Sequence, residues 1–130
     1  DSKPKTGQSD RNESLGEWEE IINTNAIQLF RYSALTFNGH RIHYDRTYAT
    51  EIEGYPGLVV HGPLLATMLS LFAERQTGRK LYKFSFRGKR PVFDLNSFTL
   101  TGSFMGKDSA EFRVLDHFSQ LSMKAEAEFI

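Results

Sequence analysis

The chain has 130 residues with 16 basic and 16 acidic side chains, so its formal net charge at pH 7 is +0. This balance gives no general attraction to nucleic acid or to an anionic membrane surface, and we expect neither as a partner. The sequence contains no cysteine, which excludes a disulfide framework, a thiolate metal site and a cysteine nucleophile within it.

A chain of this length is expected to form one domain around a single core. Its 11 Phe and 5 Tyr favour sheet faces packed against a helix. Residues 1–15 are polar, so burial cannot offset the entropy of ordering them. We predict a disordered lead or linker remnant over residues 1–15 and one folded domain over residues 16–130.

No apolar run approaches the roughly 20 residues that span a bilayer, and the first residues are not signal-like, so we expect a soluble protein.

A short amphipathic helix is predicted after Thr24, which can act as its cap. Ile27, Phe30 and Ala34 recur at helical spacing, and this pattern fades near Leu35. Residues 44–53 are polar and lead into a cluster with Gly54, Pro56 and Gly57, which is typical of a loop. Loops of this kind often line functional sites.

A second helix is predicted to start at Pro63, because the N–H that proline lacks would be unpaired at the first helical position. Gly62 before it permits a close backbone approach. Residues 64–72 are apolar on more than one side of this helix, and Gly78 is its expected stop. A helix with this pattern is normally enclosed by other elements.

Four strands are predicted in the second half, because apolar residues there recur at every second position. Turn signals between them leave short connections, which favour antiparallel neighbours. The simplest architecture is an α+β domain in which a curved antiparallel sheet wraps one central buried helix. The apolar faces of the four strands are Tyr82, Phe84 and Phe86; Phe98, Leu100, Gly102 and Phe104; Ala110, Phe112 and Val114; and Leu121, Met123, Ala125, Ala127 and Phe129.

The residues with the clearest chemical potential lie between the two predicted helices. Asn38 and His43 place a carboxamide and an imidazole five positions apart. Gly62 precedes a helix start whose N–H groups can bind an anionic oxygen. Histidine exchanges protons near neutral pH because its ordinary pKa is about 6.5, and an amide can hold one water without acting as a base. These parts suit chemistry at an acyl thioester.

Residues 32–43 resemble the signature of the MaoC-like hydratase and dehydratase family, which has the hot-dog fold. That signature runs from an aromatic residue and a small hydrophobic step, through glycine-aspartate and asparagine-proline pairs, to an aliphatic residue and a histidine. Ile42 and His43 match the last two steps. The departures are Phe37 in place of glycine, Asn38 in place of aspartate, His40 in place of asparagine and Arg41 in place of proline.

A second family element, a leucine-histidine-glycine step that opens the central helix, is matched by Val60, His61 and Gly62 at almost the expected distance. The form around Asn38 is similar to the branch of mesaconyl-CoA hydratase and fungal mitochondrial 3-hydroxyacyl-thioester dehydratase, in which asparagine is the usual residue. The resemblance covers roughly residues 16–130 and implies a single hot-dog domain. It also implies reversible hydration of a 2-enoyl thioester, carried by coenzyme A or by acyl-carrier phosphopantetheine, to an (R)-3-hydroxyacyl thioester without a further cofactor.

The chemistry of that reaction suggests a role for each motif residue. Adding water to an enoyl thioester needs a base for the water, an acid for the α-carbon and a donor for the enolate oxygen. We assign the acid and base steps to His43, the positioning of water to Asn38 and the oxyanion contact to the Gly62 N–H. His61 is interpreted as hydrogen-bonded structure and is left out of the catalytic set.

Three residues are predicted to contact the substrate. Arg41 lies inside the motif, where a guanidinium suits a free carboxylate on a dicarboxylic acyl group. Val60 belongs to the second family element. Arg87 begins the densest basic cluster after the motif, with Lys89 and Arg90, and this cluster suits either a phosphate contact or an exposed turn.

Two other functions remain open, and a metal site is not expected. A hot-dog thioesterase would want a carboxylate to activate water at the carbonyl carbon, and Asn38 argues against it. A non-catalytic subunit that binds acyl thioesters is disfavoured because His43 and Gly62 are present. His40, His43 and Asp45 lack the spacing of a helical ligand pair, and no further metal ligand is evident.

The resemblance also implies a second hot-dog unit beside this one, either as a homodimer or as an N-terminal half of one longer chain. Unpaired sheet edges are usually paired or covered, which agrees with such a partner. The branch that the chain most resembles is normally the longer kind, so the chain looks like a catalytic half. We expect the cytoplasm as its compartment, with the mitochondrion as the alternative.

Overall fold

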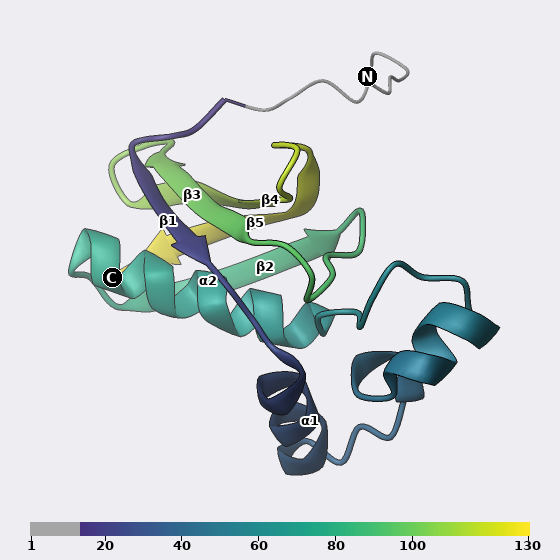
Figure 1. Cartoon of the computed structure of the whole chain (residues 1–130). Helices are drawn as coiled ribbons and strands as arrows, with labels where there is room; N and C mark the ends of the chain where they lie inside the picture. Colours follow the sequence, from purple (N-terminus) through teal and green to yellow (C-terminus); the bar gives the residue numbers. More distant parts are fainter. Residues whose placement is uncertain (1–13) are drawn as a thin grey trace.

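The computed structural model describes residues 14–130, which form five strands, two α-helices and two short helical turns (Figure 1). The predicted lead over residues 1–15 lies almost wholly outside the described residues. The elements in chain order are β1 (Trp18–Ile22), α1 (Ala26–Leu35), the 3₁₀ turn η2 (Arg41–His43), the π-helical turn η3 (Tyr48–Ile52), α2 (Gly62–Thr77), β2 (Leu81–Gly88), β3 (Phe98–Phe104), β4 (Ser109–Leu115) and β5 (Leu121–Phe129).

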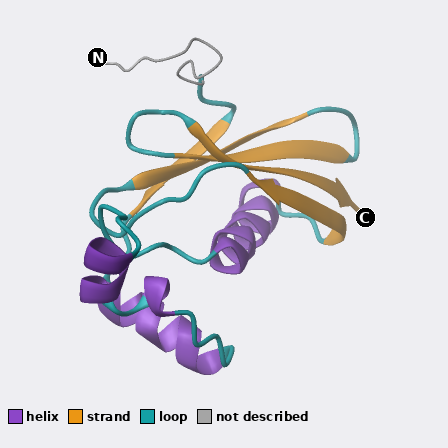
Figure 2. Ribbon diagram, turned by 90° about the vertical axis from the view of Figure 1, so that its right-hand side faces the viewer, coloured by secondary structure: helices purple, strands orange, loops and turns teal. Residues whose placement is uncertain are grey.

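The five strands form one antiparallel sheet in the order β1-β3-β4-β5-β2. Figure 2 shows α2 lying against one face of this sheet, while α1 and the short helical turns lie beyond it. Alternate residues of β3, β4 and β5 meet the buried face of α2 in one core. The predicted architecture, an antiparallel sheet packed on one central helix, is confirmed. Large members of this core are Leu69, Phe72, Phe98, Leu100, Phe112 and Val114.

The edge strand β1 has no counterpart among the predicted strands, because a five-residue segment with two glutamates gives a weak strand signal. It pairs with β3, where Trp18 lies opposite Gly102. A Cβ atom on Gly102 would lie 2.3 Å from a ring carbon of Phe112, so only glycine fits there. Trp18 also stacks on the Phe112 ring, with centroids 5.8 Å apart. Aromatic packing therefore attaches β1 to the sheet.

The first helix starts at a different cap from the predicted one. Asn25, and not Thr24, is the cap, because the Asn25 Oδ1 accepts a hydrogen bond from the Gln28 N–H at 2.9 Å. The Gln28 side chain accepts from the Asn25 N–H at 3.1 Å in return. This reciprocal arrangement satisfies two N–H groups at the helix start, whereas the Thr24 side chain is buried.

The apolar stripe of α1 is largely exposed in this chain. Ile27 and Phe30 are 64% and 56% exposed, while Leu29 and Ser33 on another face are buried. The helix packs near the start of α2 and not on the sheet, because the Ser33 hydroxyl bonds His61 there. Helical spacing predicts the repeat, but the packing partner decides which face is buried.

The central helix α2 starts and ends as predicted. Pro63 lies in its first turn, and its C-terminal cap Gly78 has a φ of 66°, in the left-handed region that favours glycine. Leu71 is 56% exposed, so the expectation that other elements enclose this helix is wrong at that position. The buried residues of this helix are Leu65, Ala66, Leu69, Phe72 and Ala73.

Two further segments differ from their predictions. In β2 a register shift between Leu81 and Lys83 bulges the strand, and Phe86 is 50% exposed because β2 lies at the edge of the sheet. The polar stretch after the motif is not all loop, since η3 forms within it and the Asp45 side chain accepts from the Tyr48 N–H at 3.0 Å. Within residues 14–130 no helix has the length and apolar character needed to cross a membrane.

Candidate active site

His43 is held by a backbone carbonyl at the end of η2. The residue is 7% exposed, and its Nδ1–H donates to the Val59 carbonyl oxygen at 2.7 Å. Because a carbonyl can only accept, this bond places the proton on Nδ1 and leaves the lone pair on Nε2. The Val59 N–H in turn donates to the Ile42 carbonyl at 2.9 Å. Two hydrogen bonds therefore join the motif to the segment before α2 and set the tautomer of His43.

The surroundings of His43 lower its pKa below the ordinary value of 6.5. Burial is the main cause, the hydrogen bond to Val59 opposes it, and the charge of His40 lowers the pKa further. The His40 and His43 ring centroids are 6.4 Å apart. The His43 ring is therefore neutral at pH 7, with an Nε2 that can accept a proton.

His61 lies directly against His43 and is 0% exposed. The two imidazole rings stack with centroids 3.9 Å apart and an interplanar angle of 17°. The His61 Nε2 and the Ser33 hydroxyl share a hydrogen bond of 2.7 Å, and the Tyr32 ring meets the His61 ring edge to face at 4.7 Å. Burial and, secondly, the charge of His43 lower the pKa of His61 to about 4.

Asn38 follows α1 through a tight turn. Phe37 stands where the resembled signature has glycine, and its φ of 56° lies in the left-handed region that glycine adopts most easily. The Asn38 N–H donates to the Ser33 carbonyl at 2.8 Å. The Asn38 Oδ1 accepts from the His40 N–H at 3.0 Å, which leaves the side-chain NH₂ group to hold a ligand.

A shallow pocket of about 380 Å³ opens beside Asn38. Its lining is mostly apolar and comes from α1 and the turn after it. His43 and Gly62 are not among its lining residues, so this chain alone does not enclose the three assigned catalytic residues in one pocket. The lining residues are Phe30, Ser33, Ala34, Phe37, Asn38, Gly39 and Tyr44.

Gly62 is the first residue of α2, so its N–H has no acceptor within the helix and lies at the positive end of the helix dipole. A Cβ atom built on Gly62 would meet no other atom within 4 Å. Packing within this chain therefore does not require glycine here. The open space at the Cβ position leaves room for a ligand beside this N–H.

Contacts around His61 connect the three residues that the sequence assigns to catalysis. His61 precedes Gly62 in the chain and stacks on His43. Ser33 bonds His61 through its hydroxyl and Asn38 through its carbonyl. These contacts of Ser33 could not be predicted from the sequence, because a single serine within a helical pattern carries no distinctive signal.

Two of the predicted substrate contacts are engaged within the chain itself. The Arg41 guanidinium bonds Asp45 through Nε and Nη2 at 3.1 and 3.0 Å, and it lies over the Tyr48 ring at 4.3 Å. The Val60 side chain is 2% exposed and belongs to the core, while its N–H donates to the Val92 carbonyl at 2.8 Å.

Within the described part of the chain, no group of three or more histidines and carboxylates is arranged to hold a metal ion.

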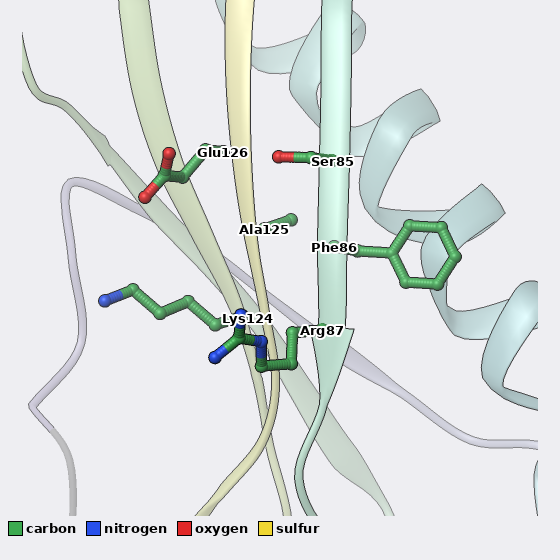
Figure 3. Close-up of a pocket in the computed structure, with 6 residues that line it drawn as sticks. All are labelled: Ser85, Phe86, Arg87, Lys124, Ala125 and Glu126. Carbon is green, nitrogen blue, oxygen red and sulfur yellow. The ribbon is translucent and has the colours of Figure 1, made fainter.

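Arg87 lies in a separate groove of about 360 Å³ on β2 and β5. Figure 3 shows Lys124 and Glu126 on the opposite side of these strands from Phe86, which points toward the α2 side. This groove shares no lining residue with the pocket beside Asn38. The structure therefore does not bring Arg87 to the motif.

Asp94 ties the segment that follows the motif to the segment that leads into α2, and the sequence analysis did not single it out. Its side chain is 4% exposed and pairs with Arg46 at 2.5 Å. Its Oδ1 also accepts from the Leu58 N–H at 3.0 Å. Because Leu58 precedes Val59, this carboxylate supports the carbonyl that holds His43.

Replacing Asp94 with alanine is expected to lower the free energy of unfolding by about 1.5–3 kcal/mol, because hydrogen bonds to a charged group are lost at a buried site. Urea unfolding followed by circular dichroism measures this loss. Asp108→Ala is the matched control: Asp108 also pairs with an arginine, Arg79 at 2.7 Å, but its side chain is 60% exposed. The free energy of unfolding of this control should fall by about 0–1 kcal/mol. Equal losses in the two variants would contradict the supporting role of Asp94.

The stability of the protein should fall as the pH is lowered from 6.5 toward about 4. In this range unfolded His61, with the ordinary pKa of 6.5, binds a proton that the folded state resists, because its folded pKa is about 4. The stabilisation is fully present above pH 6.5, and its full loss would amount to about 3 kcal/mol. Urea unfolding at pH 7 and pH 4.5 tests this. His61→Phe should weaken the pH dependence, whereas replacing the exposed His117 with glutamine should leave it unchanged; identical slopes in all three proteins would disprove the assignment.

Comparisons with known proteins identify a family and similar relatives. A family model described as hydroxyacyl-thioester dehydratase type 2 matches residues 1–94. The chain is 62% identical over 72 residues to the mesaconyl-C(4)-CoA hydratase of Chloroflexus aurantiacus, an alignment that covers 55% of this chain and 26% of that protein. It is 43% identical over 86 residues to the mitochondrial hydroxyacyl-thioester dehydratase type 2 of Schizosaccharomyces pombe, covering 64% of this chain and 29% of that protein. The alignments thus span less than a third of each of these two curated relatives.

A solved structure shares the fold. An (R)-hydratase from A. caviae involved in PHA biosynthesis superposes with a TM-score of 0.73 at 21% identity, over 88% of this chain and 94% of that one. At this identity the match concerns the fold, and it confirms the predicted hot-dog architecture. The two curated relatives fall in the two groups of the branch that residues 32–43 resemble, so that resemblance is also confirmed.

Proposed function

Because the chain belongs to the hydroxyacyl-thioester dehydratase type 2 family, we propose that it catalyses the reversible addition of water to a 2-enoyl thioester. The product is an (R)-3-hydroxyacyl thioester, carried by coenzyme A or phosphopantetheine, and the reaction needs no further cofactor. One observation carries this proposal. The bond from the His43 Nδ1–H to the Val59 carbonyl, together with a lowered pKa, supports a neutral base at Nε2.

In the hydration direction, Asn38 holds the attacking water through its carboxamide. The His43 Nε2 takes one proton from this water as the water oxygen bonds to the β-carbon. The electron pair of the double bond moves toward the thioester carbonyl, and the Gly62 N–H donates to the oxygen that becomes negative. His43 then returns its proton to the α-carbon, and the carbonyl forms again. One water is added in total, and His43 ends in its neutral form.

A dicarboxylic acyl group is the proposed substrate class, and the similarity to a mesaconyl-C(4)-CoA hydratase supports it. Arg41 is the proposed partner of the free carboxylate, which would have to displace Asp45 from the guanidinium. We expect Arg41→Ala to lower kcat/KM for mesaconyl-CoA about tenfold or more, while crotonyl-CoA, which lacks this carboxylate, changes little. An equal loss with both substrates, measured by enoyl absorbance, would exclude carboxylate recognition by Arg41.

A second hot-dog unit is proposed to complete the site. The outer edge of β2 pairs with no strand among residues 14–130, and unpaired edges are usually covered. The pocket beside Asn38 is shallow and does not include His43 or Gly62. The curated relatives are more than three times as long as their aligned parts. A partner unit, as a second copy or as the rest of a longer chain, would close the site.

The deciding assay is incubation with crotonyl-CoA and with mesaconyl-CoA, while enoyl absorbance and free thiol are followed together. Loss of absorbance without thiol release supports the hydratase. Thiol release identifies a thioesterase, which would contradict the proposal. If neither signal changes, the assay is repeated with a chain extended to the length of the curated relatives, and inactivity there also rejects the proposal in favour of a binding role.

A further inference from the structure

We propose that Ser33 and His61 form an uncharged positioning pair that fixes the His43 ring relative to Asn38 and the start of α2. The inference rests on the proposed hydratase function, because that function assigns the proton transfers to His43. Ser33 and His61 are 4% and 0% exposed. Ser33 borders the pocket beside Asn38, but its hydroxyl is bonded to His61 and is not offered to a ligand there. Their effect must pass through the residues that they contact.

Ser33 joins two parts of the site through two different atoms. Its hydroxyl shares the 2.7 Å hydrogen bond with His61 Nε2, and its carbonyl accepts from the Asn38 N–H at 2.8 Å. A displacement of Ser33 would therefore move both the residue that holds water and the ring that supports His43. Errors of about 1 Å in such groups are enough to lower rates about a hundredfold.

His61 makes contacts through the face and the edge of its ring and through its backbone. Its face lies on His43 at 3.9 Å, and Tyr32 meets it at 4.7 Å. Its carbonyl accepts from the Leu65 N–H at 3.0 Å, in the first turn of α2, and its chain neighbour is Gly62. The orientation of His43 and the position of the Gly62 N–H are thus coupled through one enclosed residue.

Stability alone does not account for a histidine at this position. Within residues 14–130 the buried His61 Nδ1 has no hydrogen-bond partner, and a buried polar atom without a partner is destabilising. A phenylalanine ring would occupy a similar place without that cost. The imidazole is therefore better explained by its contacts with His43 and Ser33 than by core packing.

The pair also confines the positive charge to His43. The titratable groups in contact with His61 are His43 from η2 and Tyr32 from α1, and His40 lies beyond His43. Burial and, when His43 is protonated, the charge of His43 lower the pKa of His61 to about 4, so His61 is neutral near pH 7. When His43 takes a proton from water, its positive charge therefore lies against a neutral ring and not against a second cation.

The test is the double variant Ser33→Ala with His61→Phe in the full chain, which removes both polar groups and keeps a ring in the stack. We expect a Tm equal to or above that of the wild type, a KM within about twofold and a kcat lowered about tenfold to a hundredfold. Imidazole ¹⁵N spectra should show His43 losing its single Nδ1–H tautomer. His61→Gln, which keeps a hydrogen-bonding group but no ring, is the second variant and should lower kcat likewise.

His117→Phe is the control, because His117 is an exposed turn residue remote in sequence from the motif, and it should change neither kcat nor the His43 signals. A folded double variant with unchanged kcat and unchanged His43 spectra would overturn the inference. Failure of the proposed function is a different result, namely a wild-type protein that hydrates no enoyl thioester. In that case the spectra decide alone: an altered His43 tautomer in the double variant supports the pair, and an unaltered one rejects it.

Discussion

Replacing His43 with alanine is expected to lower kcat for hydration by about 10²–10⁴-fold, because a positioned acid and base contributes about this factor. His43 is the single proton carrier assigned to the site, so no neighbour can take over its role. His61 cannot substitute, since it is 0% exposed. KM should change less than kcat, because the proton transfers occur in the transition state.

The measurement is the initial rate of enoyl absorbance loss, with circular dichroism to verify that the variant is folded. His40→Ala is the matched control: its ring is a neighbour of His43 at 6.4 Å, but it is exposed and carries no assigned step. It should keep most of the activity. If His43→Ala hydrated the substrate at the wild-type rate, the proposed mechanism would be wrong.

The His40→Ala variant also tests the pH profile. Since burial and the charge of His40 lower the pKa of His43, the acid limb of kcat/KM for hydration should lie below pH 6.5. Activity should be constant near pH 7 and fall as the pH drops through that pKa, because protonated His43 cannot accept a proton from water. Removing the His40 charge should move this limb to higher pH.

Replacing Gly62 with valine is expected to lower kcat/KM by about 10²–10³-fold, because the side chain would keep the thioester oxygen from the N–H, and loss of one oxyanion contact has an effect of about this size. The fold should tolerate the change, because a Cβ atom at Gly62 meets nothing within 4 Å in this chain. The added side chain would instead occupy open space beside the Gly62 N–H, where the thioester oxygen is proposed to bind.

Gly88→Val provides the comparison for Gly62→Val. A Cβ atom at Gly88 also meets no atom within 4 Å, but Gly88 ends β2 and has no assigned role in catalysis. Enoyl absorbance and thermal unfolding should separate the two: Gly62→Val stays folded with little activity, and Gly88→Val stays active. Full activity in Gly62→Val would mean that this N–H does not face the reacting thioester.

Local patterns predicted most of the fold. The period of two along β3, β4 and β5 identified the buried face of the sheet, because alternate side chains of a strand point to the same side. Gly62, Pro63 and Gly78 identified both ends of α2 through their backbone preferences. The same kind of reasoning failed for α1, where helical spacing was correct but the packing partner of the helix was unknown.

The motif, the central helix, the antiparallel strands and the family could all be predicted from the sequence, because each depends on patterns among neighbouring residues. The contacts that support the site depend instead on how distant segments pack. The bonds from His43 to Val59, from Ser33 to His61 and from Leu58 to Asp94 join residues 16, 28 and 36 positions apart. No periodicity or local spacing records such pairs, since they exist only after α1, the motif and the start of α2 have packed together.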